Sequence, residues 1–413
     1  MVFKYLKKII NRIYFTVITQ KKINKINKKI ASNNKINIIP IIIDCEVSTL
    51  NQYLEPVVEE LLKLTDYNFE FYFGETFKGA GSSYSVYKKE NVFPVNLYQY
   101  LKGDILFISP HIYPKGPESA IKIIIDHGIC SAKFSFHPKE YYLKYDIYFV
   151  TGKLNEEKIK KILQYHNLKD IVKIINIGYP KSDNLYNGNI PARIEIFNKL
   201  NLAPNKKTIL YAPSWEEGLS AREFGIQMTE IILNNKEINF IVKLHPCFFV
   251  QNTDDSYNGG KNWEQLYSPY FTLNNFTFIK EYKSDELLYI SDIMITDLSS
   301  IALEFLALEK PVIYLDCPKF EKTFNNLYKQ YNNTSYSDLL NDPLCNAGRH
   351  VGLINYDYNN ILNDIEYIIK NPEYKLKERK DFSENILSNK GTASKACVNS
   401  IIDNYKYHYN IKG

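Results

Sequence analysis

Two histidines in the sequence directly follow apolar runs that have the character of buried β-strands. His127 comes shortly after residues 121–125, and His245 comes after residues 240–244. An imidazole titrates near neutral pH, so it can take a proton from a hydroxyl or donate a hydrogen bond to a phosphate. The carboxyl ends of parallel strands meet at one edge of a sheet, where α/β proteins bind ligands. We therefore expect both histidines to lie at a ligand site.

The stretch 291–316 has the pattern of a strand, a polar turn, a helix and a second strand. Ser299 or Ser300 is suited to cap the helix, and Glu304 lies near the position of a capping-box acid. A helix that starts beside a strand end offers free N–H groups and hydroxyls, which suit a phosphate. On local chemistry alone, an ordinary capped helix is at least as good an interpretation.

Further polar and glycine residues fall at the ends of predicted strands in both halves of the chain. They are Gly128, Gly178, Lys181, Tyr211, Pro213, Ser214, Lys243, Thr296 and Asp297. One such residue is more often structural than functional, and for Asp297 the two roles are equally plausible. A group of them at the facing edges of two sheets indicates a binding site. His111 is a candidate acceptor contact near the same edge, and Arg349 is a candidate phosphate ligand.

Strand and helix patterns alternate along two halves of this 413-residue chain, separated by a turn-rich segment at 186–206. We predict an α/β protein with two Rossmann-type parallel-sheet domains, 35–200 and 201–413, that face a central cleft. Pro40 indicates that the first strand either starts late or lies at a sheet edge. The predicted strands are 38–43, 69–73, 105–108, 121–125, 147–150 and 172–177 in the first half, and 208–211, 239–244, 276–280, 293–295 and 312–315 in the second.

The first 43 residues contain ten Lys or Arg and no acid. Because the whole chain carries +5, the remainder carries −5, which argues against nucleic acid as the main ligand. Apolar residues recur at helical spacing from Phe3 to Val17, and no apolar run is long enough to span a bilayer. We interpret residues 1–34 as a basic amphipathic helix for an anionic membrane surface. A helix packed on the protein's own body, a partner-binding arm and a nucleic-acid arm are the alternatives.

Six cysteines show no CxxC pair and no regular spacing, so neither a disulfide framework nor a structural zinc site is expected. A reducing cytoplasm is consistent with this pattern. No clustered carboxylates in the sequence demand a metal, and no cofactor is required. Mg²⁺ can assist a diphosphate without dedicated protein ligands. The sequence specifies no oligomeric state.

The motifs, taken in order, resemble the CDP-glycerol glycerophosphotransferase family of teichoic acid and capsule synthesis, which has the two-domain GT-B fold. The resemblance rests on His127-Gly128, on 178–183 and 211–215, on Lys-x-His-Pro at 243–246, and on Thr-Asp-Leu-Ser-Ser at 296–300 with the following Lys-Pro-Val at 310–312. It covers roughly residues 105–320. The sequence departs from the family pattern at 129–132, at Glu216, and at Lys181 and Ser182. These departures leave the transferred group open.

The resemblance implies a transferase that moves glycerol phosphate, or a related polyol phosphate, from a CDP-activated donor to a hydroxyl of a glycan or lipid-linked acceptor. CMP would be released at the cytoplasmic face of the cell membrane, during synthesis of a cell-surface polymer. His127 is then the expected general base, and His245 stabilises the departing phosphate. Ser299 and Ser300 hold the diphosphate. A GT-B glycosyltransferase that uses a nucleotide sugar, and a non-enzymatic scaffold with a relic site, are the alternatives.

Overall fold

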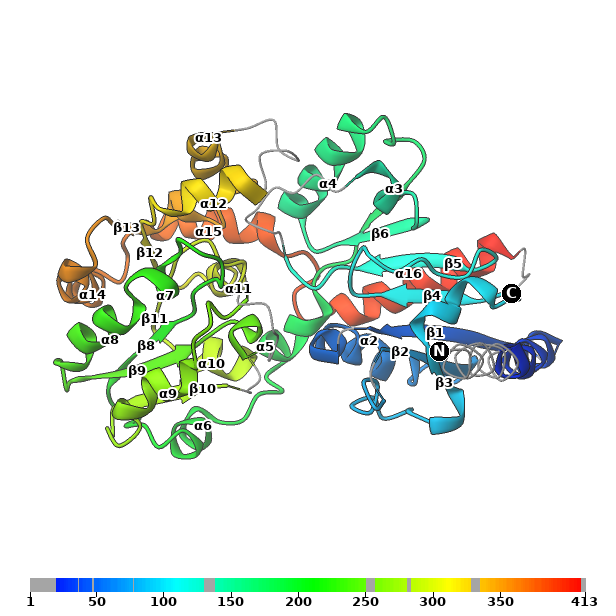
Figure 1. The fold of residues 1–413 in the computed structure, drawn as a ribbon, viewed down its shortest axis with the longest axis horizontal. Coiled ribbons are helices and arrows are strands. Elements are labelled where there is room, and N and C mark those ends of the chain that lie inside the picture. The colour runs from blue at the N-terminus through cyan, green and yellow to red at the C-terminus, as the bar shows by residue number, and fades with distance from the viewer. Residues whose placement is uncertain are drawn as a thin grey trace, which may run out of the picture.

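The computed structural model describes residues 20–35, 37–46, 48–76, 78–129, 138–249, 257–280, 284–327 and 335–409. The chain forms two domains, each built on a parallel sheet (Figure 1). The first sheet has the order β3-β2-β1-β4-β5-β6-β7, from β1 (Ile38–Cys45), β2 (Asn68–Glu75), β3 (Val92–Pro94), β4 (Leu106–Ser109), β5 (Ile121–Ile125), β6 (Ile147–Val150) and β7 (Lys173–Asn176). The second has the order β10-β9-β8-β11-β12-β13, from β8 (Lys207–Tyr211), β9 (Ile238–Lys243), β10 (Phe276–Ile279), β11 (Ile293–Thr296), β12 (Val312–Leu315) and β13 (Leu353–Asn355).

Helices connect the strands and cover the sheets (Figure 1). In the first half they are α2 (Glu55–Leu61), α3 (Lys139–Tyr142), α4 (Lys153–Tyr165), α5 (Asp183–Asn187) and α6 (Arg193–Lys199), with short 3₁₀ turns that include η1 (Ser48–Tyr53) and η4 (Pro180–Ser182). In the second half they are α7 (Ser220–Glu223), α8 (Gly225–Leu233), α9 (Trp263–Tyr267), α10 (Ser284–Ile290), α11 (Ile301–Leu306), α12 (Phe320–Leu327), α13 (Tyr336–Asn341), α14 (Ile361–Lys370), α15 (Leu376–Ile386) and α16 (Ala393–His408). The predicted two-sheet α/β architecture is confirmed.

Pro40 lies in β1, which is a central strand, so the expectation of an edge strand is wrong. β1 pairs with β2 along its whole length, from Ile38 onward, but its pairing with β4 begins only at Ile41. Pro40 therefore occupies a position where one side of the strand has no neighbour. Proline is best tolerated at such a position, where the strand is paired on one side only.

The C-terminal helix α16 packs on the first domain, although the predicted boundary assigned it to the second. Val398 and Ile401 of α16 are buried in one cluster with Val57 and Val58 of α2, on one face of the first sheet. Figure 1 shows the helix running back along that sheet. Burial of each such side chain contributes roughly 1.5–3 kcal/mol. The first domain is thus completed by the last described helix of the chain.

Residues 20–35 form a helix on the first domain, at the right-hand end of the view in Figure 1. Ile23, Ile26 and Ile30 are buried in its core. This described part packs on the protein's own body, as one of the alternatives anticipated. The apolar stripe at 3–17 lies outside the described residues. Among the helices of the described chain, none combines the length and apolar character needed to cross a membrane.

The strand order reverses at one point in each sheet, between β1 and β4 in the first and between β8 and β11 in the second. In open parallel sheets such a point leaves a crevice at the carboxyl ends of the strands, and ligands bind there. The segments that follow these strands are therefore the ones to inspect for a site.

Candidate functional site

His127 follows β5 and is held by main-chain and carboxylate oxygens. Its Nδ1 lies 2.9 Å from the carbonyl oxygen of Pro110 and 3.2 Å from Asp126 Oδ1. Both oxygens accept, so Nδ1 carries the proton and Nε2 is the basic nitrogen of the neutral ring. Burial lowers the pKa of His127, but the hydrogen bond and charge of Asp126, together with the Pro110 carbonyl, raise it above its ordinary value. The half-exposed ring is thus oriented as a general base.

His245 follows β9 and has the opposite tautomer. Its Nδ1 accepts a hydrogen bond of 3.2 Å from the main-chain N–H of Cys247, so the proton of the neutral ring lies on Nε2. Its ring lies 6.4 Å from the Trp215 ring, which in turn packs 5.2 Å from Tyr257. His245 is therefore oriented as a hydrogen-bond donor, with an aromatic wall beside it.

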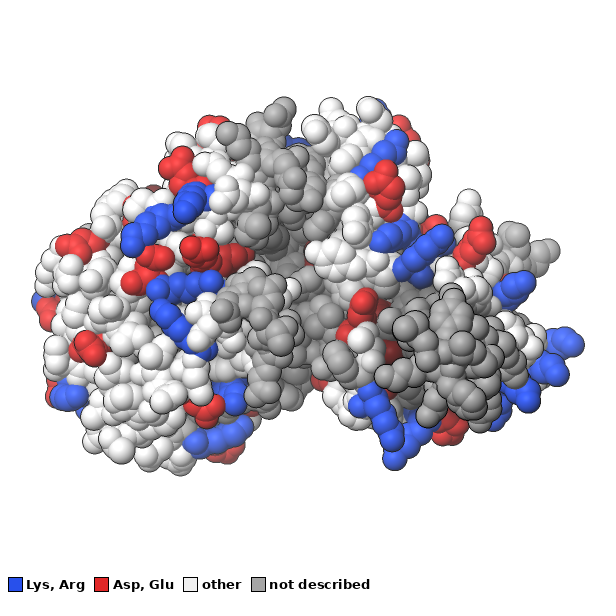
Figure 2. All heavy atoms as spheres, viewed as in Figure 1, with Lys and Arg blue, Asp and Glu red and all other residues white. Residues whose placement is uncertain are grey.

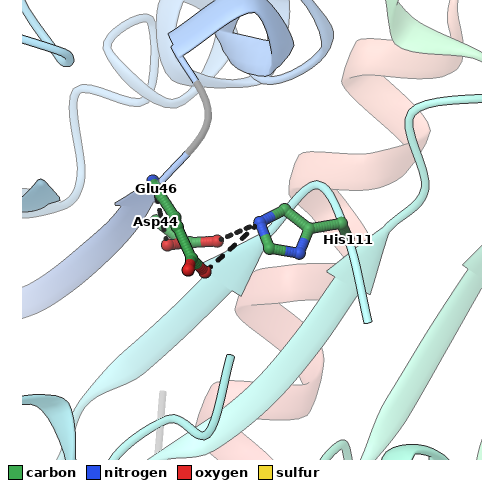
Figure 3. A group of neighbouring side chains, drawn as sticks. All are labelled: Asp44, Glu46 and His111. Atoms are coloured by element: carbon green, nitrogen blue, oxygen red, sulfur yellow. Dashed lines mark hydrogen bonds and ion pairs between the residues drawn. The ribbon is translucent and has the colours of Figure 1, made fainter. Parts of the chain in front are cut away.

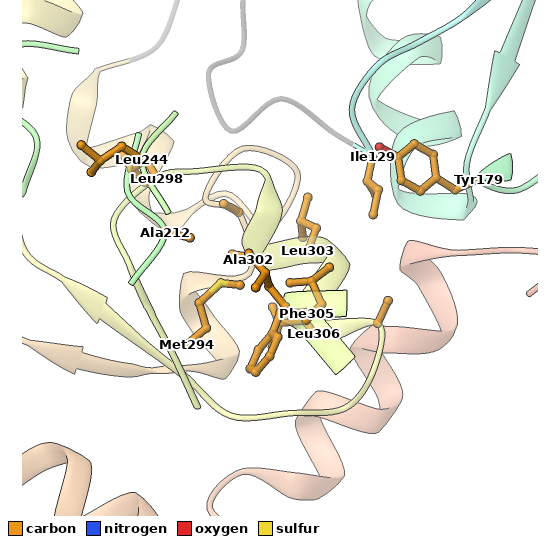
Figure 4. Packing of buried hydrophobic residues seen from close by; sticks show 14 of the residues in the cluster. Ile129, Tyr179, Ala212, Leu244, Met294, Leu298, Ala302, Leu303, Phe305 and Leu306 are labelled. Atoms are coloured by element: carbon orange, nitrogen blue, oxygen red, sulfur yellow. The ribbon is translucent and has the colours of Figure 1, made fainter. Parts of the chain in front are cut away.

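The two domains bring their predicted residues together at the junction. A Cβ atom placed on Gly128 would lie 4.0 Å from Ser300 Oγ, so the segment after β5 and the start of α11 are neighbours. Ile129 and Tyr179 of the first domain belong to the same apolar cluster as Leu303 of α11 (Figure 4). The edges that carry the two histidines therefore face one another.

Ser299 and Ser300 precede α11, as predicted, but they do not act as side-chain caps. Ser300 is the N-cap residue and makes no cap hydrogen bond through its side chain. Glu304 does not complete a capping box, because its carboxylate binds Lys181 instead. Both serine hydroxyls remain available for a ligand, so far as the described residues show.

Lys243 ends β9 and is partly buried, with no acidic partner within ion-pair distance among the described residues. Burial and, to a smaller extent, the charge of Lys181 lower its pKa, Glu304 partly compensates, and the resulting pKa is about 8. The ammonium therefore lies at the domain junction near Lys181 and Glu304. A cation that lacks a protein counterion is suited to a phosphate.

Lys181 is buried and binds Glu304 across the junction, with Nζ–Oε2 at 2.8 Å. Its ammonium also lies 5.1 Å from the centroid of the Tyr53 ring, which packs 6.0 Å from His127. Burial lowers the pKa of Lys181, but the charges of Glu304, Tyr53 and Asp285, together with the hydrogen bond to Glu304, outweigh that effect and raise it. Lys181 is thus a link between domains and not a free phosphate ligand. The sequence carried no signal for Tyr53.

Several residues that were predicted to contact the ligand are instead buried and hold the strand ends of the second sheet together. Asp297 is fully buried and accepts hydrogen bonds from the main-chain N–H groups of Ser214 and Ser220, at 2.9 and 3.2 Å, and from the Ser220 hydroxyl at 2.7 Å. Thr296 donates to the Ala212 carbonyl at 2.7 Å. Tyr211 is buried and hydrogen-bonds to Ser220. These contacts tie the ends of β8 and β11 together at the point where the strand order reverses.

Three further predictions are corrected by burial and close packing. Pro213 is buried beneath the junction. Gly178 has φ +88°, and a Cβ there would lie 2.3 Å from the Ser388 carbonyl oxygen, so it serves chain packing. The Arg349 guanidinium is held 2.6 Å from Asp316 Oδ1 and is not free for a phosphate.

His111 lies in the first domain beside two acids that the sequence prediction missed. Asp44 lies near the end of β1, Glu46 follows β1, and His111 follows β4, so all three lie where the strand order reverses (Figure 3). His111 Nε2 is 3.2 Å from Asp44 Oδ2. The same strand-end criterion that selected His127 would have found both acids.

The fold is that of a two-domain GT-B-like α/β protein with two Rossmann-like sheets, and His127, Lys243 and Ser300 lie where the two domains meet. The model of the CDP-glycerol:poly(glycerophosphate) glycerophosphotransferase family matches residues 137–403, which is more than half of the chain. The chain belongs to this family of transferases.

Curated relatives agree with that assignment, and a solved structure shares the fold. The teichoic acid poly(glycerol phosphate) polymerase of Staphylococcus epidermidis is 30% identical over 39% of this chain and 22% of its own length. The teichoic acid poly(ribitol-phosphate) polymerase of Bacillus spizizenii is 26% identical over 63% of this chain and 42% of its own length. The structure of the wall teichoic acid polymerase TagF superposes with TM-score 0.60 at 18% identity, covering 97% of this chain and 99% of that chain, and so shares the fold. The chain spans less than half the length of these two curated relatives.

Proposed function

We propose that this protein transfers a polyol phosphate from a CDP-activated donor to a hydroxyl of a glycan or lipid-linked acceptor and releases CMP. The observation that carries the proposal is the pair of opposite histidine tautomers at facing domain edges. His127 offers a basic Nε2, and His245 offers an Nε2–H donor. Membership of the glycerophosphotransferase family supports the same reaction.

In the proposed step the acceptor oxygen attacks the outer phosphorus of the donor, the one that bears the polyol. A bond forms between that oxygen and phosphorus, and the bond from phosphorus to the oxygen of CMP breaks. The acceptor proton moves to His127 Nε2, and His245 Nε2–H hydrogen-bonds to the departing phosphate. Lys243, Ser299 and Ser300 bind the diphosphate charge. Trp215 and Tyr257 form an aromatic surface suited to the cytosine ring.

Glycerol phosphate is the transferred group that we infer in first place, because the family description names it. Ribitol phosphate is the second, because a relative of comparable similarity is a poly(ribitol-phosphate) polymerase. Both polyols present hydroxyls and one phosphate, so the residues that bind the diphosphate are the same for either donor.

The test is CMP release from CDP-glycerol, with CDP-ribitol and UDP-sugars assayed in parallel. We expect CMP from a CDP-polyol, and a loss of roughly 10²–10⁴-fold in His127→Ala and in His245→Ala. His408→Ala, at an exposed histidine outside the junction, is the matched control. UDP release from a sugar donor, with CDP-polyols inert, would replace this proposal with the glycosyltransferase alternative.

We also infer that the protein works at an anionic membrane surface on the cytoplasmic face. The helix at 20–35 exposes Lys21, Lys22, Lys25 and further lysines while its isoleucines face the core. Figure 2 shows Lys and Arg side chains at the end of the molecule where this helix lies. Each lysine near an anionic surface contributes about 1 kcal/mol.

Charge substitution tests this inference without exposing the buried face of the helix. Lys21→Gln/Lys22→Gln/Lys25→Gln should weaken binding to vesicles that contain phosphatidylserine. The control is a triple substitution at exposed lysines elsewhere, Lys377→Gln/Lys380→Gln/Lys395→Gln. Equal loss in both triple variants, or in neither, would contradict a specific role for this helix.

A further inference from the structure

Asp44, Glu46 and His111 form a compact cluster at the carboxyl edge of the first sheet. One ligand atom from each residue lies within 4.8 Å of the other two. His111 Nε2 is 3.2 Å from Asp44 Oδ2 and 3.8 Å from Glu46 Oε2 (Figure 3). The turn that carries His111 also supplies the Pro110 carbonyl that orients His127. The cluster therefore lies on the acceptor side of the domain junction.

The cluster holds more negative charge than its neighbours neutralise. Asp44 is fully buried and accepts hydrogen bonds from Tyr98 Oη at 2.7 Å and Ser109 Oγ at 2.8 Å. No described residue donates a hydrogen bond to the Glu46 carboxylate. Lys144, whose charge acts on Glu46, directs its ammonium to a main-chain carbonyl instead. Two carboxylates beside a single imidazole retain at least one negative charge, and burial makes that charge costly.

The environment of the His111 imidazole is a second observation, independent of the acidic charge. His111 is only 3% exposed, and its Nε2 has no hydrogen-bond partner among the described groups. Figure 3 shows this nitrogen directed toward both carboxylates. Buried polar atoms are nearly always hydrogen-bonded in proteins, so a nitrogen that meets Asp44 and Glu46 only in ion-pair contacts, without a hydrogen bond, points to a ligand.

We propose that Asp44, Glu46 and His111 bind a divalent cation of the Mn²⁺ or Mg²⁺ class. One imidazole nitrogen and two carboxylate oxygens form a mixed donor set that suits Mn²⁺. Bonds of about 2.0–2.2 Å put the ligand atoms of one ion roughly 3–4.4 Å apart, which includes the 3.2 and 3.8 Å separations from His111 Nε2 to the two carboxylates. Ligation through Nε2 moves the ring proton to Nδ1, so the long 3.3 Å contact from the Tyr113 N–H is given up. Glu46, with 37% of its side chain exposed, leaves one side of the ion open to solvent.

The test is Mn²⁺ binding to the metal-stripped, full-length chain, followed by electron paramagnetic resonance. We expect one Mn²⁺ per chain, displaced by excess Mg²⁺. Glu46→Gln and His111→Gln should each weaken binding by more than about tenfold. Glu118→Gln, at an exposed acid of the same region, is the matched control. Circular dichroism checks the fold of each variant, and Glu46→Gln is the primary variant because its side chain is partly exposed.

Two results would overturn the cation site. One is the absence of bound Mn²⁺ at millimolar concentration, and the other is unchanged Mn²⁺ affinity in both variants that retain the fold. Neither measurement requires turnover, so failure here and failure of the phosphotransferase proposal are separate outcomes.

Discussion

The ammonium of Lys181 lies 2.8 Å from the carboxylate of Glu304, and this buried ion pair joins η4 of the first domain to α11 of the second. The ammonium lies 5.1 Å from the centroid of the Tyr53 ring, and the charges of both partners act on Lys243. The pair therefore couples the placement of the two domains to the charge at the junction.

Removal of one partner of this pair should destabilise the protein strongly. Lys181→Met leaves the Glu304 carboxylate buried without its cation, which typically costs about 3–5 kcal/mol. Replacement of both residues, in Lys181→Met/Glu304→Met, should recover most of the loss. Urea unfolding of the single and double variants measures the difference. A single variant within about 1 kcal/mol of wild type would contradict the burial of the pair.

Asp126 should set the acid limb of the pH profile. The hydrogen bond and charge of Asp126 raise the pKa of His127 against the lowering effect of burial. In Asp126→Asn the pKa of His127 should fall, so the ring stays neutral and basic to lower pH. The acid limb of kcat/KM should then move to lower pH, with Asp170→Asn, at an exposed acid, as control. An unmoved limb would exclude His127 as the titrating base.

Because of Lys243, nucleotide binding should become weaker at alkaline pH. Its pKa is lowered to about 8, so the ammonium is charged below that pH and is lost above it. We expect CDP affinity to fall by up to about tenfold between pH 7 and pH 9, since the charged fraction of an ammonium with a pKa of about 8 falls about tenfold over that range. Calorimetry on Lys243→Met should show weak binding with little change over this range. The same steep change in the variant would assign it to another group.

The lowered pKa of Lys243 should also make the folding stability of the protein depend on pH. The unfolded chain, with the ordinary value of 10.5, binds more protons than the folded chain between pH 8 and 10.5. Stability should therefore rise with pH in that window relative to Lys243→Met. Thermal unfolding at pH 7.5 and pH 9.5 gives a check that needs no ligand.

Substitution by alanine should have different effects at two glycines of the sequence motifs. Gly178→Ala places a Cβ 2.3 Å from the Ser388 carbonyl oxygen at φ +88°, so we expect a loss of at least about 1–3 kcal/mol. Gly128→Ala meets only Ser300 Oγ at 4.0 Å, which is ordinary contact. It should keep its stability and weaken donor binding. Denaturation and CDP binding measured on both variants separate the two roles.

The sheet architecture could be predicted because its strands are long apolar runs with clear breaks. β3 and β13 were missed because each has only three residues, too short for a periodic pattern. The place of α16 was missed for another reason. Its contacts with α2 join residues more than 300 positions apart, and no local pattern encodes which sheet a terminal helix covers.

The site could be predicted as a set of strand ends but not as a set of side-chain directions. Strand-end position selected His127, His245 and Lys243, whose rings and ammonium lie at the junction. The same criterion also selected Asp297 and Thr296, which turn inward. Their partners lie 77–84 residues away in sequence, so only the folded chain shows that they hold the β8 and β11 segments together.

The position of α16 has a consequence for the order in which the chain acquires its structure during synthesis. The face of the first sheet that packs with α2 stays open on the ribosome until Val398 and Ile401 have been translated and have left the exit tunnel. The second domain is complete in sequence before that moment, although it begins later. In this protein the domain that starts first is the one that must finish last.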